Sequence, residues 1–257
     1  MTEKNELPTN ESNPNKPHLS ASSLGLFAKC PEAYRRRYVE GERGKPNLAM
    51  VKGKAFHAAV EANMNAKIDT GKELPAKYLA TIANDAMADG IKDCDEDDDD
   101  CKQADDVVDQ VVFHQMNQSP HYQPTATEIP FRIELDACGH DYVGFIDMTG
   151  TLVESGEPVI VDWKTSKKKP ANNSQHDSLQ LTGYFASQAA ELGNNVELRL
   201  DYITSGKSKR VRHVLATRRD ADDVAALAQR IHIASKTIEA CIFPPADSAS
   251  AWWCSAT

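Results

Sequence analysis

The chain has 257 residues, of which 40% are hydrophobic, 7% aromatic and 26% charged. This is an ordinary globular composition, long enough for one large domain or two small ones, and it excludes collagen-like, mucin-like and fully disordered chains. No segment approaches the roughly 18 apolar residues of a transmembrane helix, and the first residues lack the apolar stretch of a signal peptide. We therefore expect a cytoplasmic protein with no membrane association.

The net charge of −9 is concentrated in one segment. Residues 89–109 contain eleven acids and two bases, so this segment alone carries a charge of −9. The rest of the chain holds 27 acids and 27 bases and is neutral overall. An acidic net charge therefore does not exclude a polyanionic partner, because bases can be segregated elsewhere. Basic clusters occur at Arg35–Arg37, at Lys167–Lys169 and between Lys207 and Arg219.

The first half of the chain is predicted to be helical. Residues 1–17 are polar and predict a disordered tail. Ser20 stands where a helix N-cap belongs, ahead of a short apolar run that is interrupted at Cys30–Pro31. Helical spacing then recurs in three segments, and the acidic segment is predicted to form a loop before the last of them. The three segments are residues 52–65, 78–88 and 107–116.

The pattern changes at Thr125 from helical spacing to strand-like alternation. Gly139, residues 154–157 and residues 205–206 supply turns between the apolar runs. The order of three strands, helix, two strands and helix predicts an α/β or α+β domain with a central mixed β-sheet flanked by helices. The expected strands are 127–135, 142–152, 158–165, 196–204 and 210–216, and the expected helices are 178–192 and 220–241.

These elements predict one domain over residues 18–257. It comprises a helical part (18–124), a catalytic sheet core (125–217), and a C-terminal helix and tail (218–257).

Charged residues end two of the predicted strands. Alternation places Asp162 and Lys164 on one face of a strand, and Asp147 ends a run on the expected antiparallel neighbour. Two adjacent carboxylates repel each other unless a cation neutralises them, and such oxygen ligands suit Mg²⁺ or Mn²⁺. A lysine beside them can polarise a phosphate, which phosphodiester hydrolysis requires. The alternative is a surface Asp–Lys pair with no chemical role.

Six short motifs occur along the chain in a fixed order. Each is weak alone, but the ordered set is specific. The motifs are Leu19–Leu24 with Cys30–Tyr38, Gly53–Glu61, Glu128–Phe131, Gly144–Asp147, Asp162–Thr165 and Gln180–Tyr184.

In these motifs the chain, from His18 to Cys254, resembles the PD-(D/E)XK nuclease superfamily. Within the superfamily it resembles the RecB-like branch, which includes CRISPR-associated and phage recombination exonucleases. The resemblance implies a restriction-endonuclease-like core with a helical N-terminal portion. It also implies that His57, Asp147, Asp162 and the Trp163 carbonyl bind a metal, and that Lys164 is the catalytic lysine.

The resemblance further implies that Gln180 and Tyr184 contact DNA or the scissile phosphodiester, so that they join Asp147, Asp162 and Lys164 in the catalytic set. Glu128 is an additional candidate for the site. Glu61 is interpreted as a partner in a helix-face ion pair. His114, His121, His140, His176, His213 and His232 have no partner pattern and are interpreted as structural.

The function implied is a Mg²⁺- or Mn²⁺-dependent deoxyribonuclease, an exonuclease of recombination or repair in a bacterial or phage-infected cell. DNA is the expected partner, together with a single-strand annealing or other recombination protein. A catalytically idle nuclease fold that binds DNA or assembles complexes is the alternative. A zinc-binding structural protein is disfavoured because the cysteines lack paired spacing. The candidate DNA-binding residues are Lys167, Lys168, Lys169, Arg35 and Arg36.

Two features stand apart from this set. Members of the branch often carry a [4Fe–4S] cluster held by four cysteines, but only Cys30 and Cys254 match that pattern, and Cys241 does not have the required spacing. Since four thiolates are the usual requirement, no cluster is expected.

The acidic segment 89–109 is interpreted as a solvated loop, and the alternative is a DNA mimic that occupies a basic groove.

Overall fold

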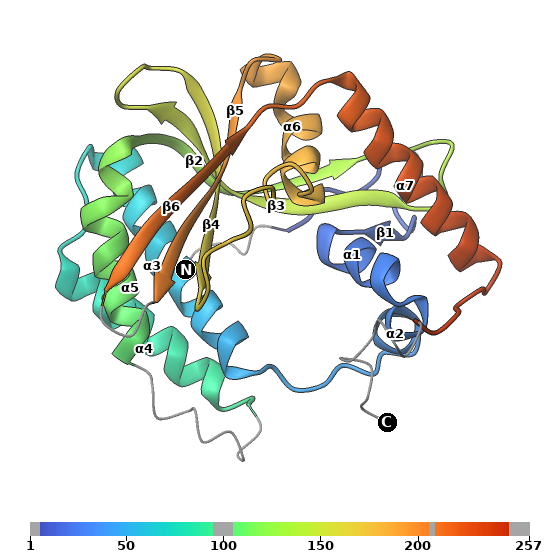
Figure 1. Cartoon of the computed structure of the whole chain (residues 1–257), viewed down its shortest axis with the longest axis horizontal. Coiled ribbons are helices and arrows are strands. Elements are labelled where there is room, and N and C mark those ends of the chain that lie inside the picture. Colours follow the sequence, from blue (N-terminus) through green and yellow to red (C-terminus); the bar gives the residue numbers. More distant parts are fainter. Residues whose placement is uncertain (1–5, 95–104, 206–208, 247–257) are drawn as a thin grey trace.

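A computed structural model describes residues 6–94, 105–205 and 209–246 of the chain (Figure 1). The N-terminal half contains β1 (His18–Leu19), α1 (Ala21–Lys29), α2 (Pro31–Tyr34), the π-helical turn η1 (Arg35–Val39), α3 (Leu48–Thr70), α4 (Ala76–Ile91), α5 (Asp105–Asn117) and the 3-10 helix η3 (Ser119–His121). The remainder contains β2 (Tyr122–Ile133), β3 (Asp141–Leu152), β4 (Pro158–Ser166), α6 (Leu179–Leu192), β5 (Glu197–Ser205), β6 (Arg210–Thr217) and α7 (Ala221–Glu239). None of the described helices has both the length and the apolar character needed to cross a membrane.

The six strands form one mixed sheet, which confirms the predicted fold class. The order along the sheet is β1-β3-β4-β5-β6, and β2 pairs with β3. β2 and β4 each run antiparallel to β3, and β6 runs antiparallel to β5. The β1–β3 and β4–β5 pairs are parallel. The short strand β1 was not predicted, because two residues are too few to show an alternating pattern.

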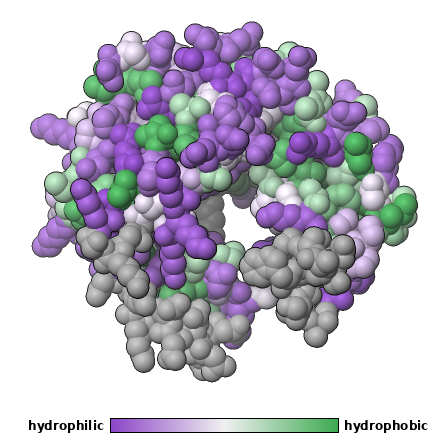
Figure 2. All heavy atoms as spheres, viewed as in Figure 1, coloured by the Kyte–Doolittle hydropathy of each residue, from purple (hydrophilic) through white to green (hydrophobic). Residues whose placement is uncertain are grey.

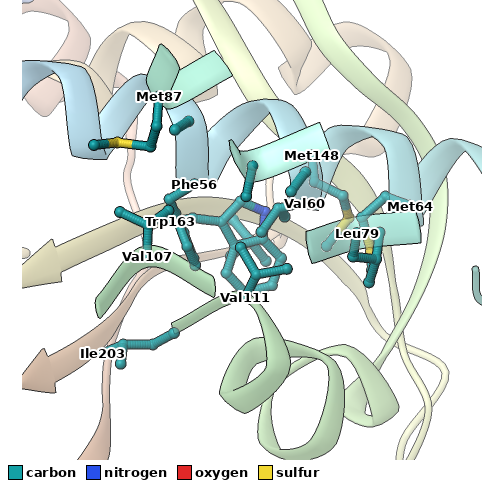
Figure 3. Close-up of a cluster of buried hydrophobic side chains, with 14 of the residues drawn as sticks. Phe56, Val60, Met64, Leu79, Met87, Val107, Val111, Met148, Trp163 and Ile203 are labelled. Carbon is teal, nitrogen blue, oxygen red and sulfur yellow. The ribbon is translucent and has the colours of Figure 1, made fainter. Parts of the chain in front are cut away.

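Helices cover both faces of this sheet and bury two separate cores. α3, α4 and α5 lie on one side of the sheet, and α6, α7 and α1 lie on the other (Figure 1). Alternation along β4 divides its side chains between the two cores: Val161 and Trp163 join the first, and Ile160 joins the second. Figure 3 shows Trp163 at the centre of the first core, near Phe56, Val60 and Val111.

The helix α3 is longer than the segment 52–65 that the sequence predicted. Its N-cap is Asn47, whose side chain accepts a hydrogen bond from the Met50 N–H, and its C-cap is Gly71, which has a left-handed φ of 70°. Both are ordinary helix caps, because short polar side chains satisfy the first N–H groups and glycine tolerates positive φ. Phe56 and Val60 bury one face of α3 against the sheet, which fixes the position of His57.

A buried polar cluster joins the sheet to the end of α5. The Asp201 carboxylate is fully buried and accepts hydrogen bonds from the Gln118 amide at 2.7 Å and the Tyr122 hydroxyl at 2.6 Å. Arg212 forms an ion pair with it at 2.7 Å. Arg212, a member of the basic cluster between Lys207 and Arg219, therefore neutralises a buried carboxylate.

The acidic segment 89–109 is structured at both ends. It begins inside α4 and ends inside α5, and residues 95–104 lie outside the described part of the chain. Arg210 on β6 pairs with Asp106 at 2.7 Å and with Asp109 at 3.1 Å. The end of the segment that continues into α5 is thus attached to the sheet and is not a free loop.

Residues 6–17, which the composition assigned to a disordered tail, lie against the edge of the sheet. Asn10 is 1% exposed and donates a hydrogen bond to Asp141 at 2.6 Å, and Lys16 pairs with the same carboxylate at 2.8 Å. Composition failed to predict this attachment because it depends on polar contacts to a residue more than a hundred positions away. The first five residues lie outside the described structure.

A glycine permits α6 to approach the sheet closely. A Cβ atom at Gly183 would lie 2.4 Å from Cε1 of Tyr142 on β3. The Tyr142 side chain is 1% exposed and its hydroxyl donates a hydrogen bond to the Leu179 carbonyl, so the ring has no room to move aside. The spacing between α6 and β3 therefore depends on the absence of a side chain at position 183.

We expect Gly183→Ala to lower the free energy of unfolding by about 1–3 kcal/mol, which is typical of overpacking in a core. Gly25→Ala is the matched control, because Gly25 also lies inside a helix and a Cβ there meets nothing within 4 Å. Both substitutions improve helix propensity, so the difference between their effects on the free energy of unfolding isolates the contact with Tyr142. Thermal and urea unfolding measure both variants, and equal stabilities would contradict the packing argument.

Candidate active site

The site lies where β3 and β4 separate. Their antiparallel pairing ends at the pair Met148–Val161, and the next residues on the two strands are Asp147 and Asp162. The Trp163 N–H donates a hydrogen bond to Oδ2 of Asp147 at 2.7 Å. This bond holds the Asp147 carboxylate against the diverging end of β4, beside Asp162. The sequence prediction that Asp147 and Asp162 lie on neighbouring antiparallel strands is confirmed.

Three donor groups from different elements converge beside this point. One ligand atom each from His57 on α3, Glu128 on β2 and Asp147 on β3 lie within 4.8 Å of one another. His57 Nδ1 is 3.5 Å from Oδ2 of Asp147. The structure thus brings together two predicted metal ligands and the additional candidate Glu128, while Asp162 is not among the three.

The backbone of Glu128 has an unusual conformation. Its φ is 45°, one of two positive φ values at non-glycine residues within the described chain. It lies between the pairs Thr127–Met148 and Ile129–Ile146, opposite Asp147. Such a conformation costs on the order of 1–3 kcal/mol and tends to occur at functional sites. The position of Glu128 therefore points to a role in the site, which the sequence indicated only through its short motif.

Burial and like charges disfavour ionisation of these acids. Burial, and then the negative charge of Asp162, raise the pKa of Asp147 well above its ordinary value. Burial, and then Asp147, raise the pKa of Glu128 to about 7. Burial lowers the pKa of His57 despite the nearby Asp162 carboxylate, so its ring is neutral and free to act as a ligand.

This donor set is suited to a divalent cation. Crowded carboxylates in a desolvated site are stable in their ionised form only if positive charge is added. Carboxylate oxygens and one imidazole nitrogen can coordinate a divalent cation, whose remaining positions water can complete. His57, Glu128 and Asp147 would hold the ion.

The second part of the site is a closed ring of polar contacts between β4 and α6. Lys164 Nζ pairs with Oδ2 of Asp162 at 2.7 Å and donates to Oε1 of Gln180 at 3.1 Å. Gln180 Nε2 donates to the Tyr184 hydroxyl at 2.6 Å, and that hydroxyl donates to Oδ1 of Asp162 at 3.1 Å. Four predicted catalytic residues are thus joined in one network.

The ring fixes the protonation states of its members. Burial alone would lower the pKa of Lys164, but the carboxylates of Asp162 and Asp147 outweigh it and raise the pKa above its ordinary value. Burial and Asp162 raise the pKa of Tyr184 far above its ordinary value, so its hydroxyl keeps its proton. Lys164 is therefore a permanent cation, held by Asp162 and Gln180 on the face of β4 that the alternation predicted.

Trp163 serves the site through its backbone. Its side chain is buried in the first core, where it packs edge-on against His114 with ring centroids 4.7 Å apart. Its N–H holds Asp147, and the His57 ring makes a backbone hydrogen bond with the same residue. Burial and neighbouring cations lower the pKa of His114 to about 3, so His114 is a neutral residue of the core.

The candidate DNA-binding residues fall into two groups. Lys167, Lys168 and Lys169 are exposed in the segment that follows β4. Arg35 and Arg36 instead pair with Glu32, at 2.7 Å and 2.8 Å. The lysines are therefore the stronger candidates for phosphate contacts.

Of the two cysteines that match the cluster pattern, Cys30 lies within the described residues. Cys30 is fully buried, and Ala246 donates its N–H to the Cys30 sulfur at 3.4 Å. Cys254 lies outside the described residues. The described C-terminal segment therefore approaches Cys30 through a backbone contact.

Comparison with known proteins agrees with this geometry. The family model of the PD-(D/E)XK nuclease superfamily matches residues 18–256, and the chain belongs to that superfamily. A crystal structure named "Putative exonuclease" from Eubacterium rectale shares the fold, with a TM-score of 0.55 and 12% identity over 94% of this chain and 90% of that one. The crystal structure of SSO0001 has 14% identity over 77% of this chain and 82% of that one, with a TM-score of only 0.31. No curated protein matches the sequence.

Replacement of a donor group is expected to weaken metal binding. Asp147→Asn removes a charge at the centre of the three-residue group and should reduce Mn²⁺ affinity by at least about tenfold, the range seen when metal-site residues are lost. Glu128→Gln should act in the same direction. Calorimetric titration with Mn²⁺ measures both, and Asp85→Asn, an exposed acid on α4, is the matched control. Unchanged affinity in Asp147→Asn would contradict the site.

Proposed function

We propose that this chain is a Mg²⁺- or Mn²⁺-dependent DNA nuclease that hydrolyses phosphodiester bonds. The observation that carries the proposal is the juxtaposition of the donor group His57, Glu128 and Asp147 with the cation Lys164 at the separation of β3 and β4. Membership in a nuclease superfamily supports it. A bound divalent ion offsets charge on phosphate oxygens and lowers the pKa of an attacking water.

The residues of the chain have distinct roles in this proposal. Asp162 keeps free lone pairs after its contacts with Lys164 and Tyr184, because a carboxylate offers about four acceptor positions, and it can therefore join the metal ligands. Lys164 places a positive charge where negative charge develops on the phosphoryl group. Gln180 and Tyr184 hold Lys164 and Asp162 in this arrangement and exclude alternative side-chain positions.

We further propose exonuclease action in recombination or repair. The motifs shared with the RecB-like branch support this assignment, as does the named exonuclease with the same fold. A recombination protein, such as a single-strand annealing protein, would be the partner. End-labelled linear DNA and covalently closed circular DNA distinguish the modes of action, because an exonuclease degrades only the linear form.

Asp162→Asn is expected to reduce DNA cleavage by at least about a hundredfold, since it removes a charge that both the cation and Lys164 require. DNA affinity should stay nearly unchanged because the exposed lysines remain. Cleavage is measured with Mg²⁺, with Mn²⁺ and with EDTA, and Asp85→Asn is the control. Full activity in Asp162→Asn would rule out the assignment, and an inactive wild-type protein that binds DNA would favour the idle nuclease fold.

Substitution of Lys164 should affect the cleavage rate, whereas substitution of the three exposed lysines should affect DNA affinity. Lys164→Ala should lower the single-turnover rate with little change in Kd. Replacement of Lys167, Lys168 and Lys169 by Ala should instead lower affinity and reduce the slope of log affinity against log salt, by up to roughly 0.7–0.9 per lost phosphate contact. If Lys164→Ala changes only binding while the triple variant changes only the rate, the two roles are reversed.

A further inference from the structure

A groove leads away from the candidate active site along an open edge of β3. At its start β3 pairs with β1 on this edge, and from Met148 onward it pairs with β4 on the same edge. Between them, within the described chain, no strand pairs with this edge at residues 143–147. The chain thus leaves a gap in the sheet that begins beside Asp147.

Two cavities follow this gap and share part of their walls. The first, of about 150 Å³, is lined by Gln180 and Tyr184 of the candidate active site together with Ser20 and residues 143–145. The second, of about 560 Å³, is lined by the same Ser20 and residues 143–145 and extends to Tyr38. The two cavities therefore adjoin each other at Ser20 and residues 143–145, between the polar ring and Tyr38. The space-filling view shows an opening through the molecule between the α1–α2 side and the α3 side (Figure 2).

The far wall of the second cavity combines aromatic and cationic groups. The Tyr38 and Tyr34 rings lie 5.2 Å apart. The guanidinium group of Arg43, which lines this cavity, lies 6.0 Å from the centre of the Tyr38 ring, and that of Arg37, just outside the lining, lies 5.8 Å from it. Within the described residues neither of these arginines forms an ion pair with a carboxylate, in contrast to Arg35.

The backbone at this wall is also unusual. Residues 35–39 form a π-helical turn, a rare conformation that occurs frequently at functional sites. Tyr38 lies within this turn and is half-buried, whereas the next residue, Val39, is 58% exposed. The turn thus presents a partly covered aromatic ring beside unpaired positive charge.

These groups match the chemistry of an unpaired nucleotide. A nucleobase stacks on an aromatic ring whatever its sequence, and arginine contributes to both stacking and phosphate contacts. Bases within a duplex are already stacked on one another, so only a single strand offers a free base to Tyr38. An apolar ligand would leave both guanidinium groups without a partner, whereas the phosphates of a nucleic acid strand would pair with them.

We propose that Tyr38, flanked by Arg37 and Arg43, is a stacking site for one base of a single-stranded DNA segment that runs along the β3 gap to Lys164. This inference rests on the proposed nuclease function, for which it names the substrate form and a second point of contact. The site would bind a strand whose scissile phosphate lies at the polar ring. Specificity for single-stranded DNA would follow from the stacking site and not from the metal.

The test measures Kd for fluorescently labelled oligo-dT by anisotropy in EDTA, which prevents cleavage. We expect Tyr38→Ala to weaken binding about tenfold and Tyr38→Phe to retain binding, because the ring stacks without its hydroxyl. Arg43→Ala should reduce the salt slope by roughly 0.7. Affinity for blunt duplex should stay unchanged in every variant. Tyr78→Ala is the control, since Tyr78 is 60% exposed on α4, far from the groove in the fold.

A scan with abasic sites separates stacking from a folding defect. In the wild-type protein, an abasic site at one position of the oligonucleotide should weaken binding about tenfold. In Tyr38→Ala the same abasic site should have no further effect, which a general loss of structure would not produce. An abasic penalty that persists in Tyr38→Ala, or no measurable binding of single strands by the wild-type protein, would overturn the inference.

The outcomes also distinguish this inference from the proposed function. Metal-dependent cleavage that is abolished by Asp162→Asn, together with unchanged binding in Tyr38→Ala, would reject the stacking site and leave the nuclease intact. The abasic effect at Tyr38 without any cleavage in Mg²⁺ or Mn²⁺ would reject the nuclease and retain the single-strand site.

Discussion

The crowding of buried carboxylates where β3 and β4 separate is the constraint on which the rest of the site depends. The hydrogen bond from the Trp163 N–H holds Asp147 next to Asp162, and Glu128 faces the same point from β2. Burial and mutual repulsion raise the pKa values of Asp147 and Glu128, so the ionised site needs positive charge. Lys164 supplies part of that charge permanently, and a divalent cation would supply the remainder.

The two cores on opposite faces of the sheet hold this arrangement in place. On one face, α3 buries Phe56 and so positions His57, while Trp163 anchors the end of β4 in the same core. On the other face, Gly183 lets α6 approach β3 closely enough for Gln180 to reach Lys164. The site therefore lies at the junction of two packed layers, where rigid elements fix each side chain.

Most of the elements follow from local patterns in the sequence, and the strand alternation also places Asp162 and Lys164 on one face. The pattern fails where contacts are distant or polar. Asn10 forms a hydrogen bond with Asp141, which lies 131 residues away along the chain, and Arg212 forms an ion pair with the buried Asp201. Neither contact leaves a periodic signal, because one polar partner across the sheet has no effect on local hydrophobic spacing.

The sequence by itself predicted the order of the longer helices and strands, the mixed sheet, and most of the residues that converge at the candidate site, because periodicity and short motifs are local properties. Only the tertiary structure decided that Glu128 joins His57 and Asp147, since that depends on the register of β2 and on one positive φ value. It also decided that Arg212 is paired with the buried Asp201 while Arg37 and Arg43 flank Tyr38. The charge of an arginine can be read from the sequence, but the group that neutralises it is set by packing.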